Sequence, residues 1–205
     1  QNAPIVADLD GDGQVEIVSG GDVFRLVNGS WTLAWRALFP ANAAPLQRPF
    51  EPNTVAVADL DGDGRAEVLH WIVNIGGAKS ADINGIHIFR HDGTLLRKIP
   101  LISYYNGFLS VADVDGDGAP EIVFTADSFV HAFRPDGSLL WSKLLPDILS
   151  GPDIIPTPAL GPLGGTRTTD GPVQVYDLDL DGRPEVIVQG MRRLFILDGR
   201  TGAER

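Results

Sequence analysis

The sequence predicts an all-β fold made of four repeated units, each with four antiparallel strands. A nine-residue acidic stretch occurs four times, at intervals of 51, 54 and 64 residues, which is in the range of blade-like β repeats. Short runs of β-branched and aromatic residues lie before and after each stretch, as expected for strands. Asn-Gly or Asp-Gly pairs, which form tight turns, separate the later runs, and no segment has helical periodicity.

The repeated stretch has acids at positions 1, 3, 5 and 9 and a glycine at position 6. Carboxylates at alternate positions of a tight turn converge on one point, and the glycine allows the sharp bend. Four crowded carboxylates repel one another unless a cation lies among them. The stretch therefore predicts a cation site in each repeat.

The expected ion is Ca²⁺, with four bound in total. A ligand set of oxygens without sulfur selects a hard ion, and the number and flexibility of the ligands favour Ca²⁺ over Mg²⁺. The backbone carbonyl of position 7 is the expected fifth donor. The predicted metal ligands are Asp8, Asp10, Asp12, Gln14 and Glu16; Asp59, Asp61, Asp63, Arg65 and Glu67; Asp113, Asp115, Asp117, Ala119 and Glu121; and Asp177, Asp179, Asp181, Arg183 and Glu185.

The surroundings of the stretch exclude an EF-hand. An EF-hand needs a bidentate glutamate at position 12 and flanking helices, whereas position 12 is here Ser19, His70, Phe124 and Val188. Strand-like runs on both sides place the stretch at the tip of a β-hairpin. A hairpin turn without metal remains the alternative, and four copies of one acid pattern favour the metal.

The strand pattern follows the same order in every unit. The predicted strands are 3–7, 15–19, 23–27 and 31–35; 54–58, 66–73, 86–90 and 95–99; 108–112, 121–125, 130–134 and 139–144; and 173–176, 185–189 and 194–197, after which the sequence stops before a fourth strand. Four strands joined up and down by short turns form the blade of a β-propeller. We predict one β-propeller region, 1–205, with repeats at about 1–40, 52–100, 107–145 and 172–205 and a long loop at 146–171.

The nine-residue repeat resembles the FG-GAP or VCBS repeat of the integrin-alpha type, in which Asp-x-Asp-x-Asp-Gly-x-x-Asp binds calcium between two strands of a propeller blade. Position 9 is Glu in every copy here, and the Phe-Gly and Gly-Ala-Pro signatures of the integrin form are missing. The resemblance implies the fold and the calcium, not integrin-like partners. It also implies a larger propeller of about seven blades, so we expect further blades or a partner chain to cover the ends of a four-blade arc.

The net charge of −11 has a specific source. Sixteen of the 27 acids belong to the four loops, which leaves eleven against 16 Lys and Arg. Four Ca²⁺ would reduce the formal charge to −3. No basic stripe is present, so the composition argues against nucleic-acid binding.

The cellular location is also predicted from composition. No apolar run approaches the length of a membrane span, and the chain has no cysteine. Low-affinity calcium loops fill where Ca²⁺ is near millimolar, which is outside the cytosol. We expect a secreted or cell-surface protein, extracellular and bacterial.

The expected function is a non-enzymatic, calcium-stabilised scaffold that presents loops for adhesion and for protein or glycan binding. The alternative, by resemblance, is the propeller domain of a polysaccharide-active enzyme such as a rhamnogalacturonan lyase. The loop 146–171 either binds a partner or only covers blade edges. Trp35 and Trp141 are expected to pack between blades, whereas Trp71 and the pair Tyr104-Tyr105 are candidates for a carbohydrate platform.

Overall fold

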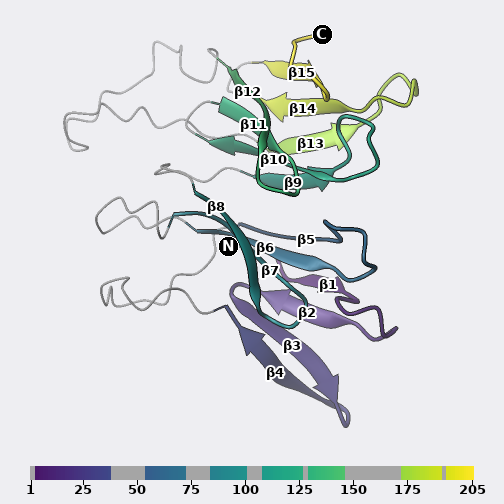
Figure 1. Cartoon of the computed structure of the whole chain (residues 1–205), viewed down its shortest axis with the longest axis vertical. Helices are drawn as coiled ribbons and strands as arrows, with labels where there is room; N and C mark the ends of the chain where they lie inside the picture. The colour runs from purple at the N-terminus through teal and green to yellow at the C-terminus, as the bar shows by residue number, and fades with distance from the viewer. Residues whose placement is uncertain are drawn as a thin grey trace, which may run out of the picture.

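In the part of the chain that it describes, the computed structural model contains fifteen strands and no helix (Figure 1). The described residues are 3–37, 54–72, 84–100, 108–126, 129–145, 172–190 and 193–205. The strands form three four-stranded antiparallel sheets and one three-stranded antiparallel sheet. The strands of each sheet are neighbours in sequence order. Each sheet with its turns is called a blade below. The described residues hold no helix that could cross a membrane.

The strand bounds agree with the prediction to within two residues. Blade 1 contains β1 (Ile5–Ala7), β2 (Glu16–Ser19), β3 (Asp22–Val27) and β4 (Ser30–Arg36). Blade 2 contains β5 (Thr54–Ala58), β6 (Glu67–Ile72), β7 (Gly85–Phe89) and β8 (Leu95–Pro100). Blade 3 contains β9 (Leu109–Ala112), β10 (Glu121–Ala126), β11 (Phe129–Phe133) and β12 (Leu139–Leu144). Blade 4 contains β13 (Val173–Tyr176), β14 (Glu185–Gln189) and β15 (Leu194–Asp198). The all-β prediction is confirmed.

The first strands of successive blades lie side by side, β1 beside β5, β5 beside β9 and β9 beside β13. The blades follow one another along the molecule, and the four acidic loops lie along the same side, at the right in Figure 1. Three apolar cores fill the spaces between successive blades. This arrangement is that of consecutive propeller blades, in which each sheet buries its faces against its neighbours.

Trp71 contributes to the core between blades 2 and 3. Its side chain is fully buried, and its ring contacts Phe124 edge-on, with the ring centroids 5.0 Å apart. The expectation that Trp71 lines a carbohydrate platform is therefore wrong, and the pair Tyr104-Tyr105 lies outside the described residues. The position is buried because the next blade covers this face of β6, which the sequence of one repeat does not show.

The outer strand of each of the first three blades reaches the next blade. Trp35 donates its indole N–H to the carbonyl of His91 at 2.8 Å, and Trp141 donates to the carbonyl of Gly199 at 2.7 Å. Arg97, at the same register position in blade 2, donates to the carbonyl of Asp136. The prediction that the two tryptophans pack between blades is confirmed.

The described blades form an open arc rather than a closed ring. No strand of blade 1 contacts a strand of blade 4 among the described residues. Loop position 2 is buried in the first three repeats, where the residues are Leu9, Leu60 and Val114. In the fourth repeat this position is Leu178, which is 48% exposed. The total of about seven blades stays a prediction, as do the repeat limits. The loop 146–171 lies outside the described residues.

Candidate metal centre

Each acidic loop connects the first and second strands of its blade. In the first loop, Asp8 follows β1 and accepts hydrogen bonds from the backbone N–H groups of Gly11 and Gly13, both at 2.8 Å. The second and third loops repeat both bonds with Asp59 and Asp113. The position 1 carboxylate thus shapes the turn, because local side chain to backbone bonds replace the ladder bonds that a hairpin tip lacks.

The glutamate at position 9 starts the second strand and is buried in every loop, with at most 2% of its surface exposed. One carboxylate oxygen accepts the backbone N–H of position 2 at 2.8–2.9 Å in all four loops. Glutamate has one methylene more than the aspartate of the related repeat. That reach allows the side chain to extend from the strand back across the loop.

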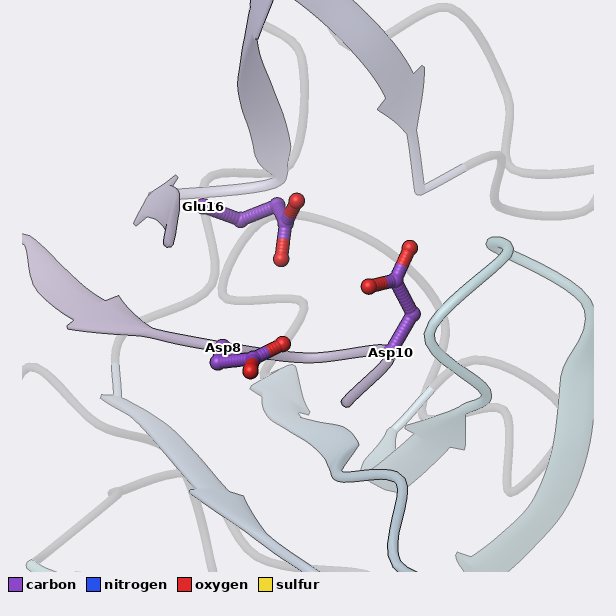
Figure 2. Close-up of side chains that lie close together, drawn as sticks. All are labelled: Asp8, Asp10 and Glu16. Carbon is purple, nitrogen blue, oxygen red and sulfur yellow. The ribbon is translucent and has the colours of Figure 1, made fainter. Parts of the chain in front are cut away.

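The loop carboxylates at positions 1, 3 and 9 converge. In each loop these three residues place oxygen atoms within 4.8 Å of one another, as Figure 2 shows for Asp8, Asp10 and Glu16. The three equivalent groups are Asp59, Asp61 and Glu67; Asp113, Asp115 and Glu121; and Asp177, Asp179 and Glu185. The structure therefore brings together twelve of the predicted ligand residues.

The position 5 aspartates lie outside these groups and are exposed. Each accepts the backbone N–H of position 7 at 2.8 Å, as Asp12 does from Gln14. The ligand roles of Asp12, Asp63, Asp117 and Asp181, and of the carbonyls of Gln14, Arg65, Ala119 and Arg183, stay predictions.

The fourth loop departs from the others at position 4. Gly11, Gly62 and Gly116 have φ between 74° and 78° there, and Leu180 has φ 59°. A side chain in this left-handed region costs about 1–2 kcal/mol, and Leu180 is also 79% exposed. The sequence pattern of the acids does not reveal this strain.

The third loop shows most directly that a cation fits. The second carboxylate oxygen of the buried Glu121 has no hydrogen-bond partner. Burial raises the pKa of Glu121, and the neighbouring loop aspartates raise it further, against the lowering effect of the hydrogen bond from Val114. Glu67 has a pKa raised for the same reasons. A buried carboxylate with an unused oxygen beside two more carboxylates requires a proton or a cation. The hard oxygen donors fit calcium, which would hold the three side chains together.

Two arginines that sequence reasoning missed contact the acid groups. Arg25 on β3 contacts Asp10 at 2.6 Å and Glu16 at 2.9 Å. Arg205 contacts Asp179 at 3.3 Å and also contacts Glu185. Only the strand register could have indicated the first contact, since Ile17 pairs with Phe24 and Glu16 and Arg25 are the next residues along the two strands.

One segment of the chain matches a known repeat family. Residues 8–70 match the FG-GAP-like repeat. This segment includes the first two acidic loops and the strands that follow them, so the predicted resemblance is confirmed there. A comparison with curated protein sequences found no match.

Solved structures share the fold over nearly the whole chain. The Vibrio cholerae biofilm matrix protein Bap1 aligns with a TM-score of 0.60 at 15% identity, over 99% of this chain and 54% of that protein. The rhamnogalacturonan lyase PL11 of Bacillus licheniformis aligns with a TM-score of 0.58 at 21% identity, over 99% of this chain and 41% of that enzyme. BBS1N, solved in complex with ARL6DN, aligns with a TM-score of 0.58 at 14% identity, over 98% of this chain and 55% of that one. The chain thus spans about half or less of these structures, and identities this low show the fold alone.

Proposed function

We propose that this chain is a calcium-stabilised β-propeller segment of an extracellular protein, and that it serves as a non-enzymatic scaffold for adhesion and for protein or glycan binding. The observation that carries the proposal is the fourfold group of carboxylates at positions 1, 3 and 9, each with a buried glutamate. The acids that converge in these loops are engaged in cation binding and are therefore not free for acid–base catalysis.

The extracellular location follows from the calcium requirement. The loops are exposed at positions 4 to 6, so bound ions would exchange readily with solvent calcium, and loops of low affinity fill only where Ca²⁺ is abundant. The similarity to a biofilm matrix protein supports the same location and an adhesive role. In this proposal further blades or a partner chain cover the two ends of the arc.

The calcium proposal is tested by ion analysis of the purified chain equilibrated at about 10 mM free Ca²⁺, at least ten times the dissociation constant of extracellular sites, about 10⁻⁴–10⁻³ M. The expected stoichiometry is near four. A stoichiometry of zero or one would contradict the proposal. Replacement of Asp61 by Asn should lower the stoichiometry by one, because Asp61 belongs to the second acid group.

The binding role is tested separately on a glycan array, with the same protein in calcium and in chelator. Calcium-dependent retention on a defined class of glycan supports glycan binding. Retention that is equal in chelator contradicts a role of calcium in glycan recognition. Absent retention contradicts glycan binding and leaves protein partners as the ligands of the scaffold.

A polysaccharide-active enzyme is the second candidate, favoured by the similarity to rhamnogalacturonan lyases. A lyase would release unsaturated uronate from rhamnogalacturonan fragments, which is detected by ultraviolet absorbance. Time-dependent product formation by the purified chain would overturn the non-enzymatic proposal. The chain covers 40–41% of those enzymes.

A further inference from the structure

The acid groups of blades 1 and 4 already contain a positive charge. In blade 1, the Nε and Nη2 atoms of Arg25 donate to Glu16 and Asp10. These are the position 9 and position 3 acids of the first group. Glu16 therefore has both oxygens bonded, one to Leu9 N–H and one to Arg25. Glu121 in blade 3 has only the first of these bonds.

The same register position is occupied by arginine in the next two blades. Phe24, Phe89 and Phe133 pair with equivalent residues of the second strands, so the residues that follow them, Arg25, Arg90 and Arg134, are equivalent. In the described part of the chain, neither Arg90 nor Arg134 forms an ion pair with a loop acid. Residue type alone therefore does not explain the contact of Arg25.

The length of the third strand explains why Arg25 contacts the loop acids and Arg90 and Arg134 do not. β3 continues to Val27, so Arg25 is a strand residue whose side chain lies beside Glu16 on the same face. β7 and β11 end at Phe89 and Phe133. Arg90 and Arg134 lie beyond these strands and begin Asp-Gly turns, in which Gly93 N–H bonds to the carbonyl of Arg90 and Gly137 N–H to that of Arg134.

In blade 4 an arginine from another position of the chain contacts the acid group. Its equivalent position is Asp198, paired with Glu185, and an acid cannot neutralise the loop. Arg205, whose backbone N–H bonds to the carbonyl of Ile196, places its guanidinium against Asp179 and Glu185. Blades 1 and 4 are the two ends of the described arc (Figure 1).

We propose that Arg25 and Arg205 are built-in cations that compete with calcium for the acid groups of the first and fourth loops, so that the four loops form two affinity classes. The second and third loops bind Ca²⁺ tightly. The first and fourth bind it at least about tenfold more weakly, because an incoming ion must displace the guanidinium from the carboxylate oxygens that it contacts. This inference rests on the proposed calcium site. Under this inference, the calcium sites at the two ends of the arc fill and empty as the calcium concentration changes, and the two sites in its middle stay occupied.

The test is a calcium-binding isotherm of the full 205-residue chain by equilibrium dialysis. The wild type should bind two ions tightly and two weakly. Arg25→Gln should bind three tightly and one weakly, since the competing charge in the first loop is gone. Arg90→Gln is the matched control, with the same residue type and register position but no ion pair to the loop, and should bind as the wild type does.

The binding isotherms test the two affinity classes separately from the calcium site itself. Four equivalent sites in the wild type, or an Arg25→Gln isotherm that superimposes on the wild type, would overturn the inference and leave the calcium site intact. Failure of every variant to bind calcium would overturn both. A second measurement needs no variant: the Arg25 Nε–H resonance should be protected from solvent exchange in chelator and lose that protection at saturating calcium. Unchanged protection would overturn the inference.

Discussion

At the residue scale, the same loop glutamate has two different environments. Glu16 shares its second oxygen with Arg25, whereas the second oxygen of Glu121 has no partner. An unpaired buried polar group costs about 1–3 kcal/mol, and the cost is larger for a charge. The two glutamates are therefore expected to respond oppositely to loss of their charge in the calcium-free protein.

Glu121→Gln should raise the free energy of unfolding by about 1 kcal/mol in chelator, because a neutral amide replaces an unpaired anion and can donate to the neighbouring aspartates. Glu16→Gln should lower it by about 1 kcal/mol, because Arg25 loses one of its two carboxylate partners and keeps Asp10. Urea unfolding in chelator measures both. In saturating calcium both variants should be less stable than the wild type, and equal effects in chelator would contradict the prediction.

His70 makes the stability depend on pH. Its side chain is fully buried, neither ring nitrogen has a hydrogen-bond partner, and the ring lies against Trp35 and Phe89. Burial lowers the pKa of His70 to about 4, helped by the charge of His87. Because the folded pKa lies below the unfolded value of about 6.5, the stability is fully present above pH 6.5 and is lost as the pH falls toward 4.

In the His70→Leu variant, the free energy of unfolding should fall less between pH 6.5 and pH 4 than in the wild type, by up to about 3 kcal/mol. The reason is that unfolding of the variant no longer takes up the proton that His70 binds in the unfolded chain. Urea unfolding at several pH values, with wild type and variant in parallel, measures the difference. The difference isolates His70 from the loop acids, which titrate in both proteins. Parallel curves would show that His70 is not the group responsible.

At the element scale, the contact between an outer strand and the next blade depends on a turn glycine. A Cβ added at Gly93 would lie 2.8 Å from the Trp35 ring, and the φ of Gly93 is +86°. Gly29, in the equivalent turn of blade 1, has φ +78° and no atom within 4 Å of an added Cβ. The two glycines thus share the backbone strain and differ in the packing.

Gly29→Ala should cost about 1–2 kcal/mol of unfolding free energy, which is the strain of a left-handed alanine. Gly93→Ala should cost about 1–3 kcal/mol more, because the added methyl group overpacks the indole. Thermal unfolding compares the two. The additional cost should shrink when Trp35 is also replaced by Ala, and an unchanged additional cost would exclude the contact as its cause.

At the scale of the whole molecule, calcium is expected to support the fold in place of disulfides, since the chain has no cysteine. An ion that binds only the folded chain contributes about 2.7 kcal/mol at hundredfold saturation. For a chain of this length, that corresponds to a shift in melting temperature of roughly 5–10 °C for each site.

Chelation should therefore lower the melting temperature steeply, and Asp61→Ala should remove one site's share of the calcium effect. Calorimetry in calcium and in chelator measures this. A melting curve that is the same in both would mean that the loops are ordinary hairpin turns.

The sequence by itself determined the strands, the loops and the convergence of most loop acids. These features are local: β-branched runs, Asp-Gly turns and alternating carboxylates act within about ten residues. The strand bounds agree to within two residues for this reason. Asp8, Asp10 and Glu16 could be grouped in advance because one tight turn connects them.

Only the tertiary structure decided which blade face is buried and which loop contains an arginine. Trp71 is core because blade 3 covers it, and Leu178 is exposed because no described blade covers it. Arg25, Arg90 and Arg134 are the same residue at the same register position, yet only Arg25 reaches a loop. The physical reason is that a side chain's burial depends on the neighbouring sheet, which the residue's own repeat does not encode. The contact of Arg25 with the acid group depends on the pairing of the folded strands, which residue type alone does not show.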